Sequence, residues 1–153
     1  MNSSKPTPRQ ARLAILLALL CVGLLPACDD REEKSPVPHS YVNLVLPLNL
    51  PQYEQLNFPG SIYTCKDEGF QGRGIFVLHC PEGEGCFRAF DATCPRHLPE
   101  RPVTVELKGH EAVCPYCNTH YNLLNEGVGG DGKYQLQRYK CHFDPPNLSV
   151  KSR

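Results

Sequence analysis

The sequence lacks the features that mark several common functional classes. It has no cluster or stripe of basic residues, which excludes the charged surface that nucleic-acid-binding proteins use. No Ser/His/Asp triad or paired-carboxylate pocket can be named in it. The glycines between residues 127 and 132 are not followed by the Lys-Ser/Thr that a phosphate-binding loop requires. The sequence therefore gives no evidence for catalysis by this chain alone, and we do not expect a stand-alone enzyme.

The sequence also lacks an apolar run long enough to cross a bilayer as a helix. The uncharged apolar stretch near the N-terminus, Leu13–Ala27, has 15 residues, whereas a span needs about 20. It follows a basic start formed by Lys5, Arg9 and Arg12. A basic segment before a short apolar one is typical of a secretory signal peptide, so residues 1–27 are predicted to be one. A buried core helix is the weaker interpretation because the run lies at the extreme N-terminus.

The end of the predicted signal, Leu25-Pro-Ala-Cys28, resembles the lipobox of bacterial lipoproteins. The resemblance implies that Cys28 becomes the acylated mature N-terminus and holds the protein on a membrane of the bacterial cell envelope, outside the cytoplasm. Ordinary cleavage with a free Cys28 and an uncleaved anchor are the alternatives. The basic start contains no twin-Arg pair, so export of an unfolded chain is expected.

The rest of the chain is long enough for one compact domain. The full sequence has 16 basic and 16 acidic residues; without Lys5, Arg9 and Arg12 the mature chain of 126 residues keeps 13 basic against 16 acidic. Residues 28–40 are charged and interrupted by proline, which predicts a flexible tether. Residues 41–153 are predicted to form the domain.

No part of the mature chain shows a sustained 3.6-residue apolar period. Short apolar runs are instead separated by Gly, Pro and Asn, which predicts an all-β sandwich or barrel of short antiparallel strands. The expected strands are 41–46, 61–65, 74–80, 86–90, 103–107, 111–114, 121–124, 135–141 and 148–150.

The most informative motif is a pair of short Cys-Pro loops. Cys94-Pro-Arg-His97 and Cys114-Pro-Tyr-Cys117 together have the spacing C-x2-H-x16-C-x2-C. Small β domains use two such loops to clamp a zinc ion or an iron–sulfur cluster. The sequence therefore predicts that Cys94, His97, Cys114 and Cys117 converge on one centre.

Around these loops the sequence resembles the Rieske iron–sulfur domain over about residues 41–150. The resemblance implies a Rieske-like small β fold with two ligand loops, a [2Fe-2S] cluster and one-electron transfer with a redox partner protein. The segments that carry it are Ala89-Phe-Asp-Ala-Thr-Cys-Pro95, Gly109-His-Glu-Ala-Val-Cys-Pro115, Asn118-Thr-His-Tyr121 and Gly129-Gly-Asp-Gly-Lys-Tyr-Gln-Leu-Gln-Arg-Tyr139.

The ligand set departs from that family. Arg96 stands where the first loop of the family has a histidine, with His97 one residue later, and Cys117 stands where the second loop has its histidine. Three thiolates and one imidazole fit zinc better than a Rieske cluster, which needs two of each. A Cys114–Cys117 disulfide is a third alternative in an extracytoplasmic compartment. With zinc, a disulfide or no metal, the protein would be a non-redox accessory or binding lipoprotein.

The other cysteines and the aromatic residues give weaker expectations. Cys80 and Cys86 flank a hairpin loop and are a candidate disulfide, worth on the order of 2 kcal/mol; Cys65 and Cys141 are a candidate second bridge or buried free thiols. Further expectations are that Tyr116 and Tyr121 pack around the site, that His120 belongs to the exit strand, and that the isolated His39, His79, His110 and His142 are not ligands.

Overall fold

A computed structural model describes residues 35–83 and 85–152. The predicted signal peptide, Cys28 and the first part of the predicted tether lie outside the described residues. None of the helices in the described ranges combines the length and apolar character needed to span a membrane.

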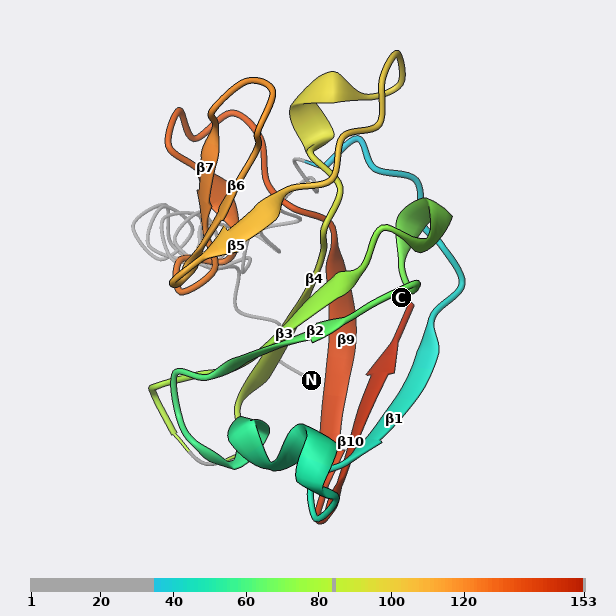
Figure 1. Cartoon of the computed structure of the whole chain (residues 1–153), viewed down its shortest axis with the longest axis vertical. Helices are drawn as coiled ribbons and strands as arrows, with labels where there is room; N and C mark the ends of the chain where they lie inside the picture. The colour runs from blue at the N-terminus through green and yellow to red at the C-terminus, as the bar shows by residue number, and fades with distance from the viewer. Residues whose placement is uncertain (1–34, 84, 153) are drawn as a thin grey trace, which may run out of the picture. The chain divides into compact units, whose positions relative to one another are not determined.

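The described chain is built from ten short strands and three 3-10 helices (Figure 1), which confirms the predicted all-β class. The strands are β1 (Asn43–Pro47), β2 (Ile62–Cys65), β3 (Ile75–His79), β4 (Phe87–Asp91), β5 (Glu106–Lys108), β6 (Glu111–Val113), β7 (His120–Asn122), β8 (Val128–Gly129), β9 (Arg138–Asp144) and β10 (Asn147–Lys151). The 3-10 helices are η2 (Pro51–Asn57), η3 (Phe70–Gly72) and η4 (Pro95–His97).

The strands form two antiparallel sheets. The larger has six strands in the order β1-β10-β9-β4-β3-β2, and the smaller has four in the order β5-β6-β7-β8. Figure 1 shows the smaller sheet beyond one end of β4, with the ligand loops at that same end. The smaller sheet and the ligand loops thus lie together at one end of the larger sheet.

Strands β3 and β4 separate two hydrophobic clusters, because successive side chains of a strand point to opposite faces. Ile75, Val77 and Ala89 belong to the first cluster, whereas Phe76 and Phe90 belong to the second. We call these the sheet cluster and the site cluster. Buried members of the sheet cluster also include Leu46, Leu56, Leu148 and Val150, and those of the site cluster include Cys94, Cys114, Tyr121 and Leu123.

Every residue of β3 is buried, which explains why this segment of the sequence is a continuous apolar run rather than an alternating one. The connection from β7 into β8 passes close to the site cluster at Gly127, which has φ +69°. A Cβ there would lie 2.9 Å from the ring of Phe90. Only glycine therefore lets the backbone at position 127 pass this close to the Phe90 ring.

The structure differs from the sequence-based expectations in local detail. The seven-residue helix η2 and the two-residue strand β8 were not expected, because each is too short to show a period. The predicted strand at 103–107 is shifted to β5, and residue 104 instead makes an isolated bridge with Thr93. Val37, within the predicted tether, is only 3% exposed, so the chain already packs on the domain there.

Candidate metal centre

The first ligand loop continues directly from strand β4. The backbone N–H of Cys94 donates a 2.8 Å hydrogen bond to the carbonyl of Val103, which extends the strand-like pairing to the first ligand. Pro95 then begins helix η4, where a fixed φ suits the first helical position. One 3-10 turn has about three residues, so the C-x2-H spacing returns His97 to the side of the chain from which Cys94 projects.

The second ligand loop is the tip of the β6–β7 hairpin. The N–H of Cys114 donates to the carbonyl of Thr119 (3.0 Å), and the N–H of Asn118 donates to the carbonyl of Cys114 (2.9 Å). Asn118 has φ +54°, a left-handed conformation that asparagine tolerates well. This tight turn makes both cysteines of the C-x2-C motif available on one side of the hairpin.

The fold brings all four predicted residues together. One ligand atom from each of Cys94, His97, Cys114 and Cys117 lies within 4.8 Å of the others. Cys94 and Cys114 are fully buried, whereas His97 and Cys117 are partly exposed. Loops separated by 16 residues in the sequence thus form one site with an inner pair and an outer pair of candidate ligands.

His97 has an unsatisfied nitrogen in this site. Its Nε2 atom is buried and has no hydrogen-bond partner among the described residues. A buried polar atom without a partner costs about 1–3 kcal/mol. Coordination to a cation would satisfy this nitrogen, and the three neighbouring sulfur atoms are the donors that thiophilic metals prefer.

The inner and outer thiols differ strongly in acidity. Burial raises the pKa of Cys94 to about 12, more than the lowering effect of its hydrogen bonds. Burial also opposes ionisation of Cys117, but the hydroxyl and backbone N–H of Thr119 stabilise its thiolate, helped by Cys114 and His97, and its pKa is lowered to about 6. The Sγ atom of Cys117 lies 3.1 Å from the Thr119 hydroxyl. This lowered pKa favours the thiolate form of Cys117 near neutral pH.

Two tyrosines adjoin the site in different ways. Tyr121 is fully buried and its hydroxyl lies 3.2 Å from the sulfur of Cys94; burial and this contact raise the pKa of the phenol. Tyr116 is 63% exposed, and its ring meets His97 edge-on with 5.0 Å between centroids. The guanidinium of Arg101 stacks over the same ring at 4.7 Å. One tyrosine thus supports the inner ligands and the other covers an outer ligand.

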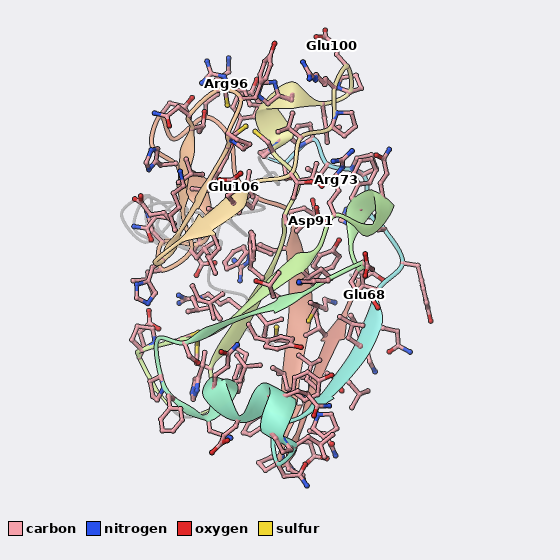
Figure 2. The ribbon with its side chains drawn as sticks, in the orientation of Figure 1. Glu68, Arg73, Asp91, Arg96, Glu100 and Glu106 are labelled. Atoms are coloured by element: carbon pink, nitrogen blue, oxygen red, sulfur yellow. A yellow bond between two sulfur atoms is a disulfide. The ribbon has the colours of Figure 1, made fainter. Side chains whose placement is uncertain are left out.

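Arg96, which occupies the histidine slot of the Rieske pattern, does not point into the ligand set. Its guanidinium contacts the hydroxyl of Thr119 (3.3 Å) and the carboxylate of Asp131 (3.8 Å). Figure 2 shows Arg96 at the outer end of the ligand loops. Arg96 therefore ties the two loops to the turn after β8 rather than serving as a ligand.

The remaining histidines lie outside the site. His120 pairs with Glu111 on the exposed face of the hairpin (2.8 Å). His79 is buried with Nδ1 at 2.8 Å from the carbonyl of Leu56, and His110 contacts the carbonyl of Gly60. His39 contacts Gln137, and His142 is on the exposed side of β9. None of these belongs to the group of four ligands.

In the part of the chain that the structure describes, the cysteines outside the site are one disulfide pair and two free thiols. Cys80 and Cys86 form a disulfide across the β3–β4 hairpin, with 5.2 Å between their Cα atoms. Cys65 and Cys141 are not bridged. Burial raises the pKa of Cys65 to about 11 and that of Cys141 to about 12. These two thiols fill space in and against the sheet cluster.

Asp91 supports the first ligand loop and was not identified from the sequence. It is fully buried, and its carboxylate accepts hydrogen bonds from the N–H of Thr93 (2.9 Å), the N–H of Phe70 (2.6 Å) and the hydroxyl of Tyr139 (2.6 Å). Figure 2 shows Asp91 inside the molecule, near the end of β4 that leads to the loop. The Asp-x-Thr spacing before Cys94 could have indicated this role in the sequence, because an aspartate side chain commonly accepts a hydrogen bond from the backbone N–H two residues later.

Comparisons with solved structures find similar folds at low sequence identity. The quaternary ammonium Rieske monooxygenase CntA aligns with 74% of this chain and 31% of its own length, at 16% identity and a TM-score of 0.48. The ferredoxin of carbazole 1,9a-dioxygenase from Nocardioides aromaticivorans aligns with 74% of this chain and 99% of its own, at 15% identity and a TM-score of 0.44. The E. coli protein NirD aligns with 74% of this chain and 97% of its own length, at 8% identity and a TM-score of 0.41.

The monooxygenase is thus matched over less than a third of its length, and the two smaller proteins over nearly all of theirs. No family model matches the chain. No curated protein matches it either.

The side chains of the site fit one metal ion better than a two-iron cluster. A tetrahedral zinc ion with bonds of about 2.0–2.3 Å separates its ligand atoms by about 3.3–3.8 Å, and here all four ligand atoms lie within 4.8 Å of one another. A Rieske cluster has two irons, one held by two thiolates and the other by two imidazoles. That arrangement spreads the ligand pairs apart, and Cys117 replaces one of the imidazoles.

Proposed function

We propose that this protein is a membrane-anchored module of Rieske-like fold that binds a metal centre outside the cytoplasm through Cys94, His97, Cys114 and Cys117. The observation that supports it best is the convergence of these four side chains within 4.8 Å. The lipid anchor at Cys28 and the extracytoplasmic location come from the N-terminal sequence. The disulfide between Cys80 and Cys86 suits that location, because disulfides persist in oxidising compartments.

The first candidate occupant is a single zinc ion. It is favoured by the Cys3His donor set, by the short separations within the set and by the unsatisfied nitrogen of His97. With zinc the centre would have no redox chemistry of its own. It would hold the two ligand loops together, and the domain would act as a binding or accessory module on the membrane.

The second candidate is a [2Fe-2S] cluster, which would make the protein a one-electron carrier for a redox partner. One observation favours it: the buried pair of Cys94 and Cys114 and the partly exposed pair of His97 and Cys117 form two layers. A two-iron cluster needs one ligand pair for each iron, with the outer iron nearer to solvent. The sequence resemblance to the Rieske family supports the same candidate.

Metal analysis of protein purified anaerobically from the envelope fraction separates these candidates. One equivalent of zinc in a colourless protein supports the first. Two equivalents of iron, visible absorbance and an EPR signal on reduction support the second. Protein without metal, and with the Cys114 and Cys117 thiols lost to a disulfide, would overturn the proposed metal centre.

The anchor is tested separately through Cys28. The variant Cys28→Ala should move the protein from the membrane fraction to the soluble fraction, because a single acylation site holds the chain. Replacing Cys141, a free thiol of the domain, by serine is the matched control and should leave fractionation unchanged. Persistence of Cys28→Ala in the membrane fraction would contradict lipidation.

A further inference from the structure

We propose that the end of the domain that carries the ligand loops faces the membrane, with Tyr116 and Arg101 in contact with lipid headgroups. This inference rests on the proposed lipid anchor at Cys28. It adds an orientation, and it implies that a partner of the metal centre must reach it along the membrane surface.

The first support is the place where the chain joins the domain. Val37 is the first residue of the described chain to be buried (3% exposed). Two residues later His39 contacts the side chain of Gln137 (3.4 Å). The carbonyl of Gln137 accepts a hydrogen bond from the N–H of Asp91 (2.8 Å), three residues before Cys94. The N-terminal segment is thus fixed beside the start of the first ligand loop, at the same end in Figure 1.

The second support is the short reach of the tether. Nine residue steps separate Cys28 from Val37, so the fully extended chain spans at most about 30 Å. A domain of this size has a radius of gyration of about 13 Å, which corresponds to a diameter of about 35 Å. Helix η2 lies at the opposite end from the ligand loops in Figure 1. A tether of this length does not allow the η2 end to rest on the membrane while the N-terminal segment stays packed at the other end.

The third support is the chemistry of the exposed loops. Tyr116 exposes 63% of its surface beside the partly buried His97, and Arg101 stacks on its ring. Exposed Pro99 and Pro115 flank this stack. Tyrosine and arginine favour the headgroup region, where an apolar body and a polar tip are both accommodated.

The charges at this end are nearly balanced. Arg96 pairs with Asp131, and exposed Glu100 directly precedes Arg101; Figure 2 shows Arg96 and Glu100 both at this end. The orientation therefore depends on the tether and on the aromatic contact more than on Coulomb attraction. We accordingly expect added salt to change it little.

The sequence contains no tryptophan. The fluorescence of a single introduced tryptophan therefore reports how deeply that one position lies in the membrane. Tyr116→Trp places the reporter on the proposed contact face. Phe58→Trp is the matched control, since Phe58 is similarly exposed (64%) and directly follows η2. Full-length lipidated protein is reconstituted in phosphatidylethanolamine/phosphatidylglycerol vesicles with and without brominated acyl chains. Quenching by the brominated lipid should be at least twofold for Tyr116→Trp and negligible for Phe58→Trp.

Arg101→Trp provides a second reporter on the same face, and metal content confirms that each variant is folded. Equal quenching of the Phe58→Trp and Tyr116→Trp variants, or no quenching of either in protein that sediments with the vesicles, would overturn the orientation and leave the anchor standing. Protein that does not sediment with the vesicles would instead refute the lipid anchor, and the orientation with it.

Discussion

The hydroxyl of Tyr121 lies 3.2 Å from the sulfur of Cys94, and both groups are fully buried. Once Cys94 is a metal-bound thiolate, the hydroxyl can donate a charge-assisted hydrogen bond to it. We expect Tyr121→Phe to keep the fold, since only an oxygen is removed. Loss of about 1 kcal/mol corresponds to an about fivefold weaker metal affinity.

Competition with a chromophoric chelator measures this affinity. The matched control is Tyr116→Phe, because the contact of Tyr116 with His97 is made by the ring and should survive loss of the hydroxyl. Equal affinity of wild type and Tyr121→Phe would show that the Tyr121 hydroxyl does not support the ligand.

The ligand set itself is tested by removing one buried thiol. Cys114→Ser should abolish stoichiometric metal binding, because a neutral hydroxyl is a poor ligand for a thiophilic metal. Cys141→Ser removes a thiol that lies outside the site and should retain one full centre. Metal content is measured by elemental analysis after purification. Full retention of metal by Cys114→Ser would mean that the ligands are wrongly assigned.

The acidity of Cys117 predicts selective alkylation of the metal-free protein. Its pKa is lowered to about 6 and it is partly exposed. The thiolate is the reactive form, so the rate of alkylation of Cys117 should rise from pH 5 and level off above about pH 7. Cys94, with a pKa raised to about 12, should stay unmodified over this range. Mass spectrometry of peptides after brief iodoacetamide treatment measures both; preferential alkylation of Cys94 would contradict the assignment.

The Asp91 carboxylate predicts a large effect on stability. Asp91→Ala leaves the buried Tyr139 hydroxyl and two backbone N–H groups without their acceptor, which should cost about 3–5 kcal/mol in the free energy of unfolding. Tyr139→Phe removes only one of these bonds and should cost about 1–2 kcal/mol. Denaturant unfolding of the metal-free proteins measures both values. Equal stability of Asp91→Ala and wild type would show that the carboxylate does not hold the loop.

Much of this architecture follows from patterns visible in the sequence. The apolar run at 74–80, the hairpin turn before Cys86 and the spacing of the two Cys-Pro loops were enough to predict β strands and a site with four ligands. Such signals are local: each reflects a strand period, a turn or a pair of side chains on one short loop. The structure places the corresponding strands within a few residues of the expected positions.

What the sequence did not predict depends on contacts between distant segments. The contact between Asp91 and Tyr139 joins residues 48 positions apart, and the contact between His39 and Gln137 joins residues 98 positions apart. The lowered pKa of Cys117 depends on how the hairpin turn aims Thr119. None of these has a periodic signature, so each becomes visible only when the chain is folded.

The separation of the interior into a sheet cluster and a site cluster implies that the molecule can open in parts. The ligand loops and the small sheet pack on the site cluster alone, so chelation of the metal should loosen that region first. Amide hydrogens of β9 and β10 would remain protected from exchange while those of β6 and β7 begin to exchange with solvent. With the proposed metal removed, the six-stranded sheet would keep its structure while the other end of the domain opens.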